Sequence, residues 1–357
     1  MLSWLGISDR TYASSWNPSN QCGVLFSENL QQRHNQVANS LNKITFGQNK
    51  LTELSIISLL VGGHILLEGS TGTGKTQFAN SLARHFQGTF QRVQFISDLA
   101  PSGILGSHVF RQDTRSYEFF KGPIFANIVL VDEINRAPSR TQSALLEAME
   151  ERQVSLQGQT YKLNDLYLII ATQNPSHHIG TFPLPEAQID RFLFSYQTHH
   201  AEPSIERQIL RSRLSHKNPA SSDFSTEPNH APISISKQDL MLAKEEVFKI
   251  DLPEKEEHFI IQLIESTRNP LAVPSDLREM LNFDDGVSFR ATEGIARSAM
   301  ARAWLHGVDH VRREDILWVS PFVLRHRIKI SEAGRLDNRS ADGLVKELIE
   351  NQLRRNP

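Results

Sequence analysis

The chain of 357 residues contains a single cysteine, Cys22. One cysteine excludes an intramolecular disulfide and a cysteine-rich metal site. The longest apolar runs are far shorter than the roughly 20 residues that a membrane span needs. The first residues also lack the basic and apolar pattern of a secretory signal. We therefore expect a cytoplasmic protein without membrane insertion.

The sequence also lacks an excess of charge of one sign, since 38 Lys and Arg residues are balanced by 40 Asp and Glu residues. The net charge of −2 does not supply the positive field of a general nucleic-acid binder. Nucleic acid is therefore not an expected partner, although the balance leaves room for a local basic groove. A hydrophobic content of 39% is sufficient for two domains, each with its own core.

Apolar, strand-like segments alternate with helical stretches in the first 200 residues. The strand-like segments are 64–68, 92–96, 128–132, 167–172 and 192–197, and the clearest helical stretches between them are 75–86 and 139–152. This alternation is typical of a parallel sheet covered on both faces. Ligands of such sheets bind at the carboxyl ends of the strands.

Two segments interrupt the alternation, and helices dominate the rest of the chain. Segment 97–123 indicates an inserted loop or hairpin, and 153–163 carries a hairpin signal. Later helices are predicted at 237–248, 254–267, 292–306 and 313–324. We expect an N-terminal extension at 1–28, an α/β nucleotide-binding domain at 29–200, and a helical lid domain at 201–357 with a flexible connection near 215–232.

A glycine-rich stretch with the pattern Gly-x4-Gly-Lys-Thr follows the first predicted strand and opens the first helix after it. Glycines let the backbone N–H groups wrap phosphates, a lysine reaches the β and γ oxygens, and a threonine hydroxyl is offered to Mg²⁺. The alternative is a glycine-rich turn that binds nothing, but such a turn does not require Lys-Thr after the last glycine. The candidate nucleotide-binding residues are Gly69, Ser70, Thr71, Gly72, Thr73, Gly74, Lys75, Thr76 and Gln77.

Two carboxylates follow the most apolar predicted strand, at Asp132 and Glu133. Together with Thr76, Asp132 is predicted to serve the Mg²⁺ shell, and Glu133 is predicted to act as the general base for the attacking water. The alternative is an acidic turn that only solvates a strand end. The two motifs together predict ATP and Mg²⁺ as cofactors.

A polar amide, Asn174, ends the strand predicted at 167–172 and precedes Pro175. Beside the two carboxylates it would hydrogen-bond the attacking water and the γ-phosphate, and it is a candidate catalytic residue. The alternative is a turn-forming asparagine before a proline. The neighbouring motifs favour the catalytic interpretation.

Taken together, these residues resemble the AAA+ ATPases and, more narrowly, the MoxR family. The stretches that carry the resemblance are 62–69, 121–125, 132–138, 141–151, 171–175 and 184–192. The resemblance extends from about residue 41 to residue 330. It implies an AAA+ P-loop domain with a parallel sheet, followed by a small all-helical lid domain.

The resemblance also implies an oligomeric ring, most often a hexamer, with ATP bound between neighbouring subunits. Arg191 matches the arginine finger that reaches the γ-phosphate of a neighbour, and Arg290 matches the sensor-2 arginine that contacts the nucleotide of its own subunit. Arg136 and Arg140 are near the expected subunit edge and are further candidates for the finger. Phe289 replaces the usual proline before the sensor arginine, so the helix start is less constrained in φ.

The family further implies chaperone-like remodelling, maturation or activation of client protein complexes, including metal or cofactor insertion. The resemblance also implies a partner with a von Willebrand factor A domain. This chain contains no Asp-x-Ser-x-Ser motif, so that partner would be a separate protein. The two interrupting segments resemble the helix-2 insert and the pre-sensor-1 hairpin, which commonly face the pore or the client. Two alternatives stay open: a nucleic-acid-dependent AAA+ motor, and a nucleotide-gated scaffold with negligible turnover.

Overall fold

The computed structural model describes residues 28–44, 49–69, 74–173, 181–198, 233–284 and 286–355, together with residues 203, 206, 207, 210, 211 and 214. The predicted extension before residue 28 and the predicted connection near 215–232 lie outside these residues. The statements below concern the described residues.

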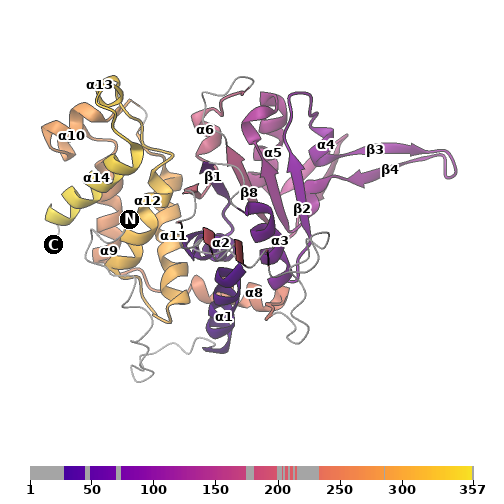
Figure 1. Cartoon of the computed structure of the whole chain (residues 1–357), viewed down its shortest axis with the longest axis horizontal. Helices are drawn as coiled ribbons and strands as arrows, with labels where there is room; N and C mark the ends of the chain where they lie inside the picture. The colour runs from indigo at the N-terminus through magenta and orange to yellow at the C-terminus, as the bar shows by residue number, and fades with distance from the viewer. Residues whose placement is uncertain are drawn as a thin grey trace.

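A five-stranded parallel sheet is the centre of the α/β part, with the strand order β2-β5-β8-β1-β9 (Figure 1). Its strands are β1 (Ile65–Gly69), β2 (Phe90–Gln94), β5 (Ile128–Asp132), β8 (Leu168–Gln173) and β9 (Phe194–Thr198). The predicted parallel sheet is confirmed. The strand ends differ from the predicted ones by at most two residues.

Helices cover both faces of the sheet. They are α1 (Glu28–Ile44), α2 (Asn49–Val61), α3 (Lys75–His85) and α5 (Ser139–Glu151), with the short helices α4 (Ser102–Leu105) and α6 (Glu186–Ile189). Because successive side chains of a strand point to opposite faces, β5 contributes to two cores. Ile128 and Leu130 pack with α1, α2 and α3, whereas Val129 and Val131 pack with α5.

The two interrupting segments form antiparallel hairpins, as the sequence indicates. The first consists of β3 (Gly106–Arg111) and β4 (Ser116–Lys121), and Figure 1 shows it extending away from the α/β part. The second consists of β6 (Gln153–Leu156) and β7 (Gln159–Lys162). Phe119 of the first hairpin stacks on Tyr161 of the second, with 4.1 Å between the ring centroids, so the two hairpins meet at their bases.

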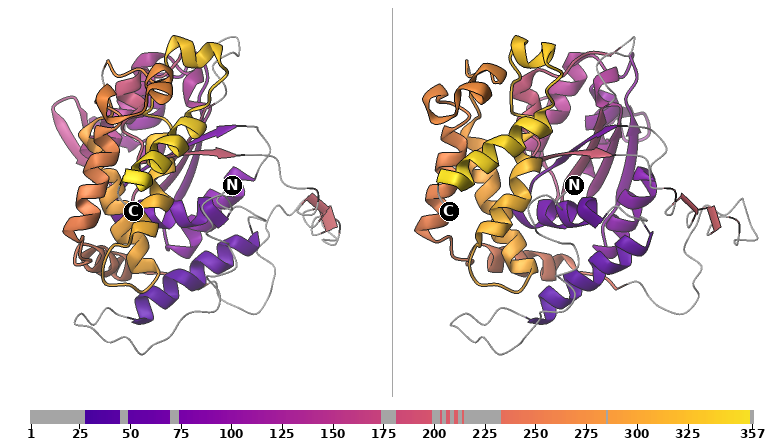
Figure 2. Two further views of the ribbon diagram at one scale, coloured as in Figure 1. Left: turned by 90° about the vertical axis from the view of Figure 1, so that its left-hand side faces the viewer. Right: turned by 60° about the vertical axis from the view of Figure 1, so that its left-hand side comes forward.

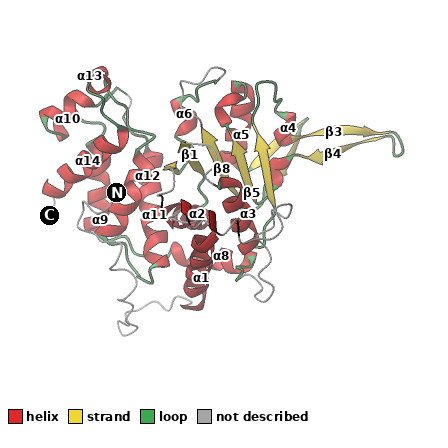
Figure 3. Cartoon of the chain, in the orientation of Figure 1, coloured by secondary structure: helices red, strands yellow, loops and turns green. Residues whose placement is uncertain are grey.

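The remaining elements are helical and lie beside the sheet (Figure 3; right-hand view of Figure 2). They are α8 (Lys237–Val247), α9 (Glu254–Glu265), α10 (Ser275–Met280), α11 (Phe289–Leu305), α12 (Arg313–Leu324), α13 (Glu332–Leu336) and α14 (Ala341–Arg355). The all-helical lid is confirmed, and its helices share one core with α1, α2 and α3. Within the described part of the chain, no helix has the length and apolar character needed to cross a bilayer.

Helix α8 lies against the α/β part, although it comes after residue 200 in the chain. Asp239 of α8 pairs with Arg33 of α1 at 3.0 Å, and the Ile235 N–H donates to the His85 carbonyl at 2.7 Å. The chain therefore returns to α1 and α3 before it continues into the lid. The domain boundaries expected from the sequence stay a prediction.

Gly69, at the end of β1, occupies a position that other residues fit poorly. Its φ is +119°, and a Cβ added there would approach the Thr198 carbonyl oxygen to 2.4 Å. We expect Gly69→Ala to lower the free energy of unfolding by about 2–3 kcal/mol, through both backbone strain and this collision. Urea denaturation without nucleotide measures the change.

Gly158 supplies the matched control, because its φ is +79° and a Cβ there would meet nothing within 4 Å. Gly158→Ala should lose only about 1 kcal/mol, from the positive φ. Equal losses in the two variants would show that the contact between β1 and β9 tolerates a side chain.

Candidate active site

The phosphate-binding loop predicted from the sequence connects β1 to α3. Ser70, Thr71, Gly72 and Thr73 lie outside the described residues, while Gly69 and Gly74 flank them. Gly74 precedes α3 with a φ of +78°, and a Cβ added to it would meet nothing within 4 Å. No side chain caps this end of the helix. The first N–H groups of α3, which have no partners within the helix, therefore adjoin the loop.

Lys75, Thr76 and Gln77 form the first turn of α3. Burial lowers the pKa of the Lys75 amine, and the negative charge of Asp132 acts in the opposite direction. Thr76 is exposed on the same turn, and Gln77 is half-buried beside it.

Asp132 is the last residue of β5 and pairs with a residue of the neighbouring strand. Its Oδ2 lies 2.6 Å from Nε of Arg92 on β2. Parallel pairing sets this position, because Gln94 of β2 is opposite Asp132 in the strand register. The carboxylate is therefore presented at the carboxyl edge of the sheet, on the strand that lies between β2 and β8.

Glu133 has a left-handed backbone conformation, with φ 58° and ψ 53°. Residues other than glycine seldom adopt it, because it costs roughly 1–2 kcal/mol. The Glu133 N–H donates to Thr172 Oγ1 of β8 at 2.8 Å, which helps to hold the strained turn. Gln94 donates to Glu133 Oε2 at 2.8 Å, and Arg136 Nε lies 3.0 Å from the same oxygen. The carboxylate is thus oriented by side chains from both sides.

The residues at this edge fit a magnesium nucleotide. Mg²⁺ in such sites is held by one or two protein oxygens together with phosphate oxygens and water. Thr76 and Asp132 would be the two protein oxygens, and no group of three or more His, Cys, Asp or Glu side chains converges anywhere in the described ranges. The open N-terminus of α3 and the Lys75 ammonium complete a set of donors for phosphate.

Asn174 lies outside the described residues, so its catalytic role stays a prediction. It follows Gln173 directly, the last residue of β8. Strand β8 pairs with β1 on one side and with β5 on the other. The sequence places Asn174 immediately after the strand that separates the phosphate-binding loop from the two carboxylates.

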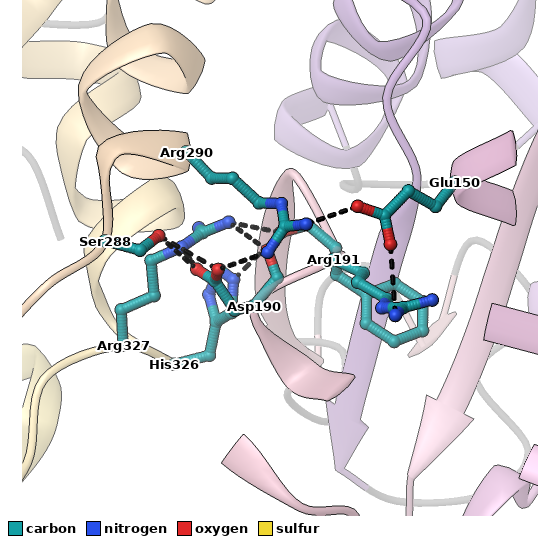
Figure 4. A network of polar contacts seen from close by, with 8 residues as sticks. Glu150, Asp190, Arg191, Ser288, Arg290, His326 and Arg327 are labelled. Atoms are coloured by element: carbon teal, nitrogen blue, oxygen red, sulfur yellow. Dashed lines mark hydrogen bonds and ion pairs between the residues drawn. The ribbon is translucent and has the colours of Figure 1, made fainter. Parts of the chain in front are cut away.

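A second group of charged residues joins the α/β part to the lid, and it includes both arginines predicted from the sequence (Figure 4). Arg191 Nη2 lies 3.1 Å from Glu150 Oε2 at the end of α5. Arg290, in the first turn of α11, pairs with the other oxygen of Glu150 and lies 3.3 Å from Asp190 Oδ2. The finger and sensor candidates are thus bound to the same carboxylate within one chain.

Asp190 and Arg327 connect the lid to the residues that precede β9. Arg327 is 4% exposed, and its Nε donates to Asp190 Oδ1 at 2.7 Å. Its two other guanidinium nitrogens donate to backbone carbonyls, including those of Asp190 and Phe192 at 2.8 Å. Ser288 donates to both oxygens of Asp190 at 2.9 Å. Burial acts to raise the pKa of Asp190, but the bonds and charge of Arg327 outweigh it and the pKa is lowered.

The family comparisons agree with this architecture and define the class of the protein. The family model described as "ATPase family associated with various cellular activities (AAA)" matches residues 64–194, and that of the AAA lid domain matches residues 276–348. The chain is therefore a member of the AAA+ ATPase class. The resemblance inferred from the sequence is confirmed at this level.

Individual relatives narrow the assignment. The uncharacterized protein YeaC of Bacillus subtilis is 35% identical over 331 residues, which are 91% of this chain and 96% of YeaC. Chaperone MoxR1 of Mycobacterium tuberculosis is 36% identical over 311 residues, which are 87% of this chain and 79% of MoxR1. A crystal structure of a candidate ATPase from Cytophaga hutchinsonii has a TM-score of 0.81 and 33% identity, and the match covers 90% of this chain and 95% of that one. The chain belongs to the MoxR family of AAA+ ATPases.

Several residues around these two groups were not predicted from the sequence. Thr172, Gln94 and Asp190 lie within or next to the predicted strands and motifs, and their polar side chains at strand ends were a usable signal. Arg327 follows α12 in a run of basic residues. Nothing local in that run distinguishes the buried arginine from its neighbours. Arg136, considered from sequence as a finger candidate, pairs with Glu133 of its own chain.

The Arg327 contacts predict a large effect on stability. Arg327→Met would leave the Asp190 carboxylate and several carbonyls without their donor in a mostly buried position. We expect a loss of about 3 kcal/mol or more in the free energy of unfolding. Chemical denaturation measures it. Arg335→Met, at an exposed arginine of α13, should change the free energy of unfolding by no more than about 0.5 kcal/mol. A loss as large as that of Arg327→Met would contradict the structural role given to the Arg327 contacts.

Proposed function

We propose that this chain hydrolyses ATP to ADP and phosphate in an oligomeric ring, which we expect to be a hexamer, in the cytoplasm. Movement between the α/β part and the helical lid would be coupled to the nucleotide state. The ring would use this movement to remodel, mature or activate client protein complexes, including by metal or cofactor insertion. Membership of the family and the name of the relative MoxR1, a chaperone, support this proposal.

The observation that supports the proposal is the strand order, in which β8 pairs with β1 on one side and with β5 on the other, so that the segment before Lys75 and the residues Asp132 and Glu133 lie toward the same edge of the sheet. The charge of Asp132 acts to raise the pKa of the Lys75 amine, which agrees with this arrangement, and Glu133 follows Asp132 directly. Lys75 would neutralise the β and γ phosphates, and Thr76 and Asp132 would hold Mg²⁺, which supplies charge neutralisation to the transferred phosphoryl group. Glu133 would accept the proton of the attacking water.

Arg191 and Arg290 are the residues through which assembly into a ring would contribute to catalysis. Arg191 would neutralise the charge that develops on the γ-phosphate of the neighbouring subunit. Arg290, from the lid, would contact the nucleotide of its own subunit and so connect the lid to the nucleotide state. The position of Arg290 at the start of α11, beside residues that precede β9, supports this second assignment.

The two hairpins are the surfaces that we propose for the client. Phe110 and Tyr117 of the first hairpin are exposed and contact each other, with their ring centroids 5.3 Å apart. Exposed aromatic side chains of this kind mark protein interaction sites. We also propose a separate partner with a von Willebrand factor A domain.

Two alternatives make different predictions about turnover. A nucleic-acid-dependent motor would show ATPase stimulation by DNA or RNA with a steep salt dependence. A nucleotide-gated scaffold would release phosphate no faster than a Glu133→Gln variant. The net charge of −2 and the fixed orientation of Glu133 favour the ATP-hydrolysing remodeller over both.

Binding and hydrolysis can be separated by two substitutions. Lys75→Ala should abolish ATP binding, because it removes the cation that faces the phosphates, whereas Glu133→Gln should bind ATP normally and lose hydrolysis by about 10²-fold or more. Calorimetry with ATP and Mg²⁺ measures binding, and phosphate release measures turnover.

Two matched variants control for loss of charge alone. Lys249→Ala and Glu147→Gln alter exposed residues away from this edge and should leave both quantities unchanged. The general-base assignment is wrong if Glu133→Gln hydrolyses ATP at the parent rate. The phosphate-site assignment is wrong if Lys75→Ala binds ATP as the parent does.

Action of Arg191 across a subunit boundary predicts complementation. Arg191→Ala alone should lose about 10³-fold in turnover. Mixing it with Lys75→Ala should restore part of the activity, because a Lys75→Ala subunit still offers its Arg191 to a neighbour that binds ATP. The recovery should be largest near equal amounts. Absence of recovery at every ratio would contradict action in trans.

A further inference from the structure

One carboxylate, Glu150, binds both of the arginines that the proposed function assigns to the nucleotide. Its Oε2 lies 3.1 Å from Arg191 Nη2, and its Oε1 pairs with Arg290 Nη2 (Figure 4). Glu150 belongs to the last turn of α5, Arg191 follows α6, and Arg290 belongs to the first turn of α11. Three separate elements, one of them in the lid, are therefore connected through a single side chain.

Glu150 is the carboxylate that Arg191 and Arg290 share, because the other carboxylate of this group already has two closer partners. Three guanidinium groups, those of Arg191, Arg290 and Arg327, are matched by only two carboxylates, Glu150 and Asp190. Asp190 is already occupied by Arg327 at 2.7 Å and by the Ser288 hydroxyl at 2.9 Å, and its distance to Arg290 is the longer 3.3 Å. Arg191 has its one ion pair in the described residues with Glu150.

A carboxylate and a phosphate compete for the same guanidinium donors. Each guanidinium binds Glu150 through one nitrogen, so the carboxylate neutralises part of the positive charge and occupies some of the donors that would otherwise bind a phosphate oxygen. Glu150 has a side chain that is 39% exposed. Pairs at this level of exposure change an equilibrium by a factor of only about two to five each. The ion pairs of Glu150 are therefore strong enough to affect where the two arginine side chains lie, and weak enough for phosphate to replace the carboxylate.

We propose that Glu150 is a positioning residue that holds Arg191 and Arg290 together and competes with phosphate for both. This inference depends on the proposed function of the two arginines. When Arg290 leaves Glu150 and binds the nucleotide of its own subunit, Glu150 keeps only its ion pair with Arg191. The position of the Arg191 side chain then depends on that single ion pair. Binding of nucleotide in one subunit thereby affects the position of the Arg191 that this subunit offers to its neighbour.

The test compares Glu150→Gln with Glu147→Gln, the same change one turn earlier on the exposed face of α5. Both are made in the Glu133→Gln background, so that ATP is not consumed, and the Kd of ATP with Mg²⁺ is measured by calorimetry. Glu150→Gln should bind ATP about two- to tenfold more tightly, and Glu147→Gln should bind it as the background does.

A double-mutant cycle separates competition for an arginine from a structural effect. In an Arg290→Ala background, the gain in ATP affinity from Glu150→Gln should be smaller, because one of the two arginines that it releases is absent. Melting temperatures of all variants verify folding, and Glu150→Asp, which keeps the charge, should remain within about twofold of the parent Kd.

Equal ATP affinity of Glu150→Gln and Glu147→Gln, or an equal gain with and without Arg290, would overturn the role of Glu150 while leaving the proposed function in place. Failure of the parent chain to bind ATP, or normal binding by Lys75→Ala, would overturn the proposed function and this inference with it. A gain that is larger with Arg290 than without it supports both.

Discussion

The parallel register of three neighbouring strands is the constraint on which the rest of the structure depends. Because β8 pairs with β1 on one side and β5 on the other, the ends of these strands reach the same edge of the sheet. The lysine that opens α3 and the carboxylates Asp132 and Glu133 at the end of β5 are far apart in the sequence, and this strand order directs them toward the same edge. Apolar residues on both faces of β5 bury the strand and fix this register.

A second constraint joins this edge to the lid. The short segment between α6 and β9 carries Asp190 and Arg191, and the lid reaches it through Arg327, Ser288 and Arg290. Arg327 is buried and pairs with Asp190, whereas Arg191 and Arg290 are partly exposed and share the accessible Glu150. The interface thus combines one buried ion pair with more exposed ones, and the exposed pairs are the weaker of the two kinds.

The sequence was sufficient for the sheet, the hairpins, the class and the family, because each depends on local patterns. Apolar strands, turn residues and the Gly-x4-Gly-Lys-Thr pattern are all short-range signals. Helices α10, α13 and α14 were missed, and so were the partners of Glu133 and Asp190. Thr172 is 39 residues from Glu133 and Arg327 is 137 residues from Asp190, so these contacts exist only once the chain has folded. The predicted roles of Ser70 to Thr73 and of Asn174 rest on the sequence alone.

The central claim is that Lys75, Thr76, Asp132 and Glu133 surround one magnesium nucleotide at this edge of the sheet. A crystal structure of the Glu133→Gln variant with ATP and Mg²⁺ tests it most directly. The account predicts the β and γ phosphates on Lys75 and the first turn of α3, with the ion bound near Thr76 and Asp132. Nucleotide bound elsewhere, or phosphates out of reach of Lys75, would contradict it.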